Sequence, residues 1–138
     1  MKFFFFQILM LATTLASCES ARYQDNVIDS ITSSYSKRLY KNEGLELIGS
    51  GGTMMHDIES VELHYCINKN VDVNSARKLF VNSVEGLVTE INKDVKIRPY
   101  LHEYPFTHHN AEVKISFYGQ DNRFVIKPYI AYVSEVLP

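Results

Sequence analysis

The sequence has no excess of basic residues and no long apolar run. Lys and Arg number 14 against 16 Asp and Glu, which gives a formal net charge of −2 at pH 7. A nucleic-acid partner would favour a basic field, so this balance argues against that class of function. The most apolar stretch covers residues 3–15, which is shorter than the ~20 residues that a membrane-spanning helix needs.

Cysteine is scarce, and repeats are missing. Cys18 and Cys66 are the two cysteines in 138 residues. No internal repeat, charge block or low-complexity linker follows residue 18, and the length suits a single domain. Nine Tyr and eight Phe are available to build a core, although four of the Phe lie in the first six residues.

The N-terminus has the composition of an export signal. Lys2 precedes a Phe- and Leu-rich stretch, and the small residues Ala16 and Ser17 lie before Cys18. This order matches a basic segment, a short apolar segment and a cleavage point. The run Leu15-Ala16-Ser17-Cys18 resembles the lipobox of bacterial lipoproteins. The resemblance covers residues 1–18. It implies that residues 1–17 are a cleaved signal peptide and that Cys18 becomes the lipidated N-terminus, anchored in a membrane of the cell envelope.

Two other interpretations of this N-terminus are open. It could be an ordinary cleaved signal that leaves Cys18 as a free thiol, or an uncleaved anchor. Under the lipoprotein interpretation, Glu19 stands where some Gram-negative lipoproteins carry an Asp that implies inner-membrane retention, which favours the outer membrane. Lipid on Cys18 would also leave Cys66 without an intramolecular disulfide partner, so the core must hold the domain.

The chain after the cleavage point predicts an α+β fold. An amphipathic helix is expected over residues 21–43, within a lipidated segment 18–43, and one α+β domain over 44–138. The firmest element is a helix at 73–92, whose apolar residues recur at helical spacing with Asp72 placed to cap it. Gly86 inside this helix suggests a close backbone contact. Strands are expected near 45–48, 60–68, 111–118 and 123–133.

These elements predict a helix followed by ββαββ. The expected sheet is mostly antiparallel, has four strands and packs on the helix at 73–92. The glycine cluster at 49–52 is interpreted as a hairpin turn or bulge, because no following helix or nearby Lys supports a phosphate-binding loop. Pro128 indicates that the last strand lies at an edge or contains a bulge.

Glu62, His64 and Cys66 alternate along the predicted strand 60–68 and share one of its faces. A single metal ion could not bind all three, because residues i and i+4 on a strand lie ~13 Å apart. A Cys66 nucleophile activated by His64 would lack a visible third group that orients the pair. These residues are therefore expected to form a mixed strand face that is either solvent-facing or packed.

The segment 98–110 is predicted to be a long loop and is the strongest candidate for binding. Its aromatic residues either roof the edge of the sheet or present an anchor to a protein partner; they are Tyr100, Tyr104 and Phe106. Its histidines are His102, His108 and His109, and we expect them to be polar surface groups. Adjacent side chains on an extended chain point in opposite directions, which argues against a shared metal ion.

No motif after residue 18 specifies a reaction, and no cofactor or catalytic residue is assigned. The leading hypothesis is a lipid-anchored envelope protein that binds another envelope protein or component. One alternative is a small hydrolase or metal-binding protein that uses its histidines and Cys66. Another is a carrier of a small apolar ligand between the helices and the sheet.

Overall fold

The computed structural model describes the backbone of residues 2–121 and 123–134, and the side chains within these ranges from Tyr23 onward. The side chains of the predicted signal peptide and of Cys18 lie outside this description. Among the described residues, none of the helices combines the length and the hydropathy that crossing a membrane requires.

The element order confirms the predicted α+β class. The chain forms α1 (Lys2–Glu43), β1 (Glu46–Thr53), β2 (Ser60–Asn68), α2 (Val73–Lys93), a short 3₁₀ helix η1 (Arg98–Tyr100), β3 (Ala111–Tyr118) and β4 (Tyr132–Ser134). The strands lie in the order β1-β2-β3-β4 in one sheet.

The sheet is mixed, so the expectation of a mostly antiparallel sheet is wrong. β1 pairs antiparallel with β2, and β3 pairs antiparallel with β4, but the central pair β2 and β3 is parallel. The reason is the connection between the central strands. α2 returns the chain to the end of the sheet where β2 began, and the next strand therefore runs in the same direction.

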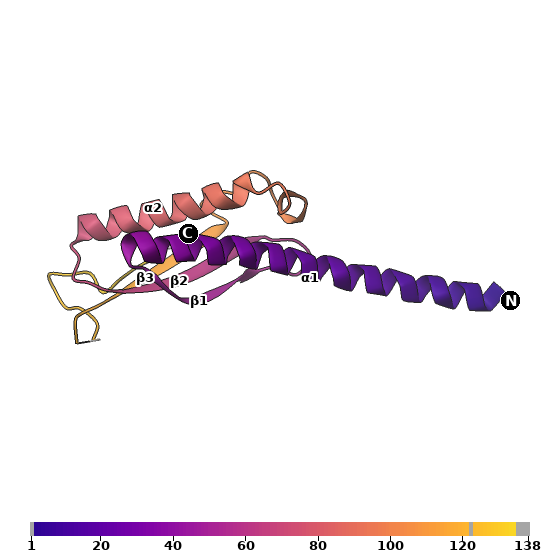
Figure 1. Ribbon diagram of the computed structural model, residues 1–138, viewed down its shortest axis with the longest axis horizontal. Coiled ribbons are helices and arrows are strands. Elements are labelled where there is room, and N and C mark those ends of the chain that lie inside the picture. The colour runs from indigo at the N-terminus through magenta and orange to yellow at the C-terminus, as the bar shows by residue number, and fades with distance from the viewer. Residues whose placement is uncertain (1, 122, 135–138) are drawn as a thin grey trace.

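Both helices cover the same face of the sheet (Figure 1). α1 contacts β1 and α2, whereas α2 contacts β3 and β4. The inward residues of the central strands are fully buried beneath the helices: Val61, Leu63, Tyr65, Val113, Ile115 and Phe117. The alternation predicted for residues 60–68 is thus confirmed, and the opposite face of the sheet carries the polar residues of these strands.

The glycine cluster lies within β1 and not in the turn that follows it. The register with β2 shifts between Leu47 and Gly49, which marks a bulge at this point. Gly52 has a φ of 151°, and a Cβ there would meet the carbonyl oxygen of Ser60 at 2.2 Å. A glycine is therefore required at position 52, and residues 54–59 connect β1 to β2.

The predicted last strand at 123–133 is also corrected. β4 contains three residues, Tyr132–Ser134, and most of the segment 119–131 consists of turns and irregular backbone. Pro128 lies in this irregular part, where its lack of an N–H does not interrupt a strand.

α1 and α2 cross where Tyr35 packs on Gly86. The Tyr35 hydroxyl donates to the carbonyl oxygen of Ser83 at 2.7 Å, and Ser36 shares a hydrogen bond of 2.8 Å with the Tyr65 hydroxyl below it. A Cβ at Gly86 would lie 2.5 Å from the Tyr35 oxygen. The close contact expected at Gly86 is thus confirmed, and the buried residues of α1 belong to the same core as those of α2.

We expect Gly86→Ala to destabilise the protein, although alanine in a helix interior is about 1 kcal/mol more favourable than glycine. The new methyl group must displace the buried Tyr35 ring, and overpacking of this kind costs ~1–3 kcal/mol. Urea unfolding should therefore show a fall in stability of up to about 2 kcal/mol. Glu85→Ala, at the adjacent exposed position, is the matched control and should change stability little. A Gly86→Ala protein more stable than the wild type would show that Tyr35 does not pack there.

Candidate functional site

The three aromatic residues of the loop 98–110 do not form a common exposed surface. Phe106 is 1% exposed, and its backbone exchanges two hydrogen bonds of 2.8 Å with the side chain of Asn92. Tyr100 is half-buried, and its ring lies 5.7 Å from that of Tyr23 in α1. Tyr104 is exposed, with the Arg98 guanidinium 4.8 Å from its ring centre. Of the two interpretations of these aromatic residues, a packed cover over the sheet fits the buried Phe106. Tyr104 is exposed at the surface.

The polar strand residues also have local partners. Glu62 accepts a hydrogen bond of 2.6 Å from Lys114, and His64 shares one of 3.0 Å with Ser116. Burial, followed by the nearby Glu46 carboxylate, raises the pKa of the Cys66 thiol. A reactive cysteine requires a lowered pKa. This face thus lacks an activated Cys–His pair among its described residues.

The histidines of the loop separate into two groups. His108 and His109 lie in a turn, and their ring centres are 4.0 Å apart. The expectation that these side chains point in opposite directions is wrong, because it assumed an extended chain. His102 instead has its own partners on the connection between β1 and β2.

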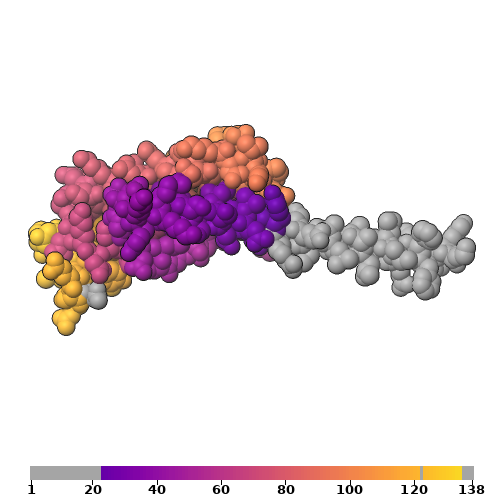
Figure 2. Space-filling model, viewed as in Figure 1, coloured from indigo at the N-terminus to yellow at the C-terminus, as the bar shows by residue number. Residues whose placement is uncertain are grey.

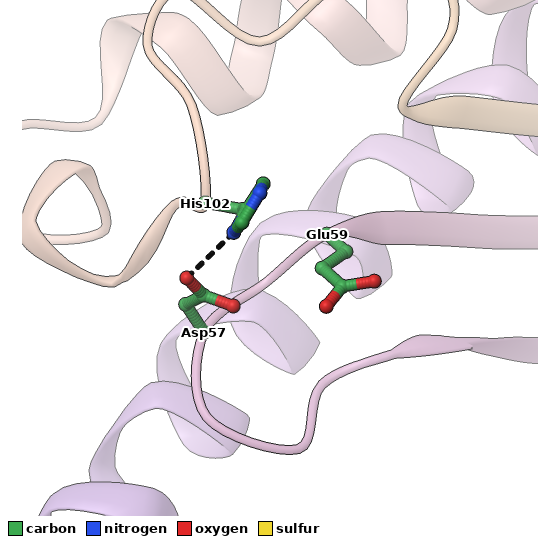
Figure 3. A group of neighbouring side chains, drawn as sticks. All are labelled: Asp57, Glu59 and His102. Carbon is green, nitrogen blue, oxygen red and sulfur yellow. Dashed lines mark hydrogen bonds and ion pairs between the residues drawn. The ribbon is translucent and has the colours of Figure 1, made fainter.

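His102 meets Asp57 and Glu59 in what we call the His102 cluster (Figure 3). The His102 Nδ1 donates to an Asp57 carboxylate oxygen at 2.8 Å. Ligand atoms of the three side chains all lie within 4.8 Å of one another. In the described part of the chain, this is the one group of three or more His, Cys, Asp or Glu residues with such spacing.

A parallel bridge between Ile58 and Leu101 positions the cluster. The Ile58 N–H donates to the Tyr100 carbonyl at 2.7 Å, and the His102 N–H donates to the Ile58 carbonyl at 3.0 Å. Ile58 and Leu101 are both buried. Since successive side chains on extended backbone alternate in direction, the neighbours of these two residues must point outward.

Hydrogen bonding to Asp57 raises the pKa of His102. The negative charges of Asp57, Glu59 and Glu103 act in the same direction, whereas the slight desolvation of the ring lowers it. The neighbouring carboxylates therefore favour the protonated form of the imidazole. The sequence shows that Asp57 and Glu59 are two positions apart, but nothing in it indicates that His102 lies beside them.

A second surface gathers apolar side chains at the other end of the sheet. Its members are exposed or line a groove of about 420 Å³ between α2 and β4. Ile126 is 82% exposed and Tyr132 is 66% exposed. We call this the distal surface, made of Val73, Phe80, Val81, Phe124, Ile126, Tyr129 and Tyr132. Sequence reasoning missed it, because a continuous strand over 123–133 would have turned alternate residues inward.

The two surfaces lie at opposite ends of the body. Figure 2 shows the loop after α2 at the end where α1 enters, whereas the segment around 119–134 is at the far end. The contact between Tyr23 and Tyr100 places this turn of α1 beside that loop. The His102 cluster belongs to the same end, because it joins the connections 54–59 and 94–110.

We expect His102 to titrate above its usual pKa of ~6.5, because the folded protein stabilises its charged form. The stabilisation from this pair is then complete below the unfolded-state pKa and is lost as the pH rises through the higher folded-state pKa. An NMR titration of the imidazole protons measures this directly. Asp57→Asn should return the pKa of His102 towards ~6.5, and Glu103→Gln should change it less. An unaltered titration in Asp57→Asn would contradict the pairing.

Comparisons of the chain with protein-family models, with curated proteins and with solved structures found no match. The two surfaces must therefore be interpreted from their own geometry and chemistry.

Proposed function

We propose that the chain is a lipid-anchored protein of a bacterial cell envelope, whose folded domain binds another envelope protein through the distal surface. The lipobox-like residues 15–18 support the anchor, and Glu19 favours the outer membrane. The observation that carries the binding role is the concentration of exposed apolar side chains at the end of the body opposite the one where α1 enters.

The position of Cys18 relative to the body supports this arrangement. Cys18 lies five residues before Tyr23 in the continuous helix α1, a separation of ~8 Å along a helix axis. A lipid on Cys18 would thus hold the connections 54–59 and 94–110 close to the bilayer surface. The distal surface would then face away from the membrane, where a protein partner has access to it.

The composition of the distal surface suits a protein partner. Interfaces are enriched in aromatic residues, and truncation of the central ones weakens binding most. Phe124 stacks on Tyr118 with ring centres 4.7 Å apart, which holds this aromatic group in place. The groove between α2 and β4 is open to solvent. It therefore suits an inserted side chain better than the enclosed small ligand of a carrier.

The enzyme alternative has less support. His64 is engaged with Ser116, and the pKa of Cys66 is raised and not lowered. A thiol-based hydrolase would need the reverse arrangement.

We expect Cys18→Ser to abolish incorporation of labelled fatty acid and to move the protein out of the membrane fraction. The reason is that the thiol is the acceptor of the lipid in the proposed anchor. Cys66→Ser is the matched control and should leave both labelling and fractionation unchanged. Full labelling of Cys18→Ser would show that the anchor is elsewhere or absent.

The binding surface can be located by photo-crosslinking in cells. A photo-crosslinking residue at Ile126 or Tyr132 should give a discrete adduct with one protein, whereas the same residue at Tyr104 or Met55 should not. These four side chains are all exposed, so accessibility does not separate them. The double variant Ile126→Ser/Tyr132→Ser should then weaken binding of the identified partner by about tenfold or more. An adduct at Tyr104 without one at Ile126 would favour the loop 98–110 instead, and no adduct at any position would contradict the binding role.

A further inference from the structure

We propose that the His102 cluster binds a divalent transition metal ion, of which Zn²⁺ fits its ligands best. The cluster offers one imidazole nitrogen and two carboxylates, the donor types that Zn²⁺ combines in proteins. Ca²⁺ and Mg²⁺ prefer ligand sets made of oxygen, so the imidazole disfavours them. This inference does not depend on the lipid anchor or on the distal surface.

The distances allow the three side chains to close on one ion. In a tetrahedral site with bonds of ~2.0–2.2 Å, ligand atoms lie roughly 3.4 Å apart. The His102 nitrogen and the Asp57 oxygen are 2.8 Å apart, and all three ligand atoms lie within 4.8 Å of one another. Figure 3 shows the carboxylates of Asp57 and Glu59 turned towards each other on one side of the imidazole. Small rotations of exposed side chains are therefore sufficient.

The backbone beneath the cluster is already ordered. The bridge between Ile58 and Leu101 fixes both segments, and the Asn110 side chain donates to the Glu59 carbonyl at 3.0 Å. The Glu59 N–H donates in turn to the Thr53 carbonyl at 2.9 Å. Metal binding would thus order three side chains but no loop, which lowers its entropic cost.

The charges of the cluster also match a dication. Asp57 is paired with His102, and among the described residues Glu59 has no ion pair with Lys or Arg. Zn²⁺ would replace the proton that His102 Nδ1 donates to Asp57, and the two carboxylates would balance its charge. Three protein ligands leave the fourth tetrahedral position open to water or to a group from a partner.

Because the metal ion competes with a proton for His102, its affinity should depend on pH. Asp57 accepts this proton in a hydrogen bond, and the charges of Asp57, Glu59 and Glu103 favour the protonated form. Below the pKa of His102, the apparent affinity should fall about tenfold for each pH unit. Above that pKa, it should level off.

Isothermal titration calorimetry of the full-length protein with ZnCl₂ tests the proposal. We expect one Zn²⁺ per chain. His102→Ala, Asp57→Asn and Glu59→Gln should each weaken binding about tenfold or more, while His109→Ala and Cys66→Ser should leave it unchanged. MgCl₂ and CaCl₂ should give no comparable binding. NMR supplies a second measurement, since Zn²⁺ should shift the imidazole signals of His102 before those of the other histidines.

Several results would overturn the proposal. One is Zn²⁺ binding that persists in all three ligand variants. Another is binding that is lost in His109→Ala or Cys66→Ser, which would place the ion elsewhere. Equal binding of Ca²⁺ would show a site governed by acidic charge and not by the imidazole. Circular dichroism should match the wild type in every ligand variant, because the three side chains lie outside the core, and above the pKa of His102 the thermal midpoints should match as well. An unfolded His102→Ala would overturn the proposal, since the cluster would then be a structural contact.

Discussion

The parallel pairing of β2 with β3 decides where every connection of this fold lies. Parallel neighbours cannot be joined by a tight hairpin, so the chain must cross back over the sheet, and α2 is that crossover. As a result, the connections 54–59 and 94–110 meet at one end of the sheet, and 69–72 and 119–131 meet at the other. The bridge between Ile58 and Leu101 is also parallel, and it joins the connection that leads into β2 to the one that leads into β3. The His102 cluster is thus a direct consequence of strand direction.

The second consequence is a sheet with two unlike faces. The helices bury the apolar residues of one face, and the other face carries charged pairs across the strands. Glu62 and Glu112 lie directly opposite each other in the register of β2 and β3, an arrangement in which like charges repel. Lys114 donates to Glu62 at 2.6 Å and lies 3.0 Å from Glu112, and these hydrogen bonds raise its pKa. The lysine offsets the repulsion and keeps this face polar.

The predictable parts of the structure are those that a local pattern determines. Helix α2 follows from its apolar periodicity and its cap, and Asp72 indeed accepts from the N–H groups of Asn74 and Ser75. The alternation of β2 is equally local. Strand direction is different, because an alternating strand has the same pattern whether its neighbour is parallel or antiparallel. The burial of Phe106 and the approach of His102 to Asp57 depend on that direction and on partners distant in sequence, so composition and spacing could not reveal them.

The packing of α1 links the two proposals about placement and binding. The sequence predicts an amphipathic helix over residues 21–43, and α1 contributes both apolar and polar side chains to the core. Ile28 and Tyr35 are buried, as are the polar side chains of Gln24, Thr32 and Ser36. α1 is also one continuous helix from Lys2 to Glu43, so no flexible tether separates position 18 from the body. A lipid at that position would therefore fix the orientation of the sheet relative to the bilayer as well as its location. The distance of the distal surface from the membrane would then be set by the length of the β-strands, because these strands connect the two ends of the domain.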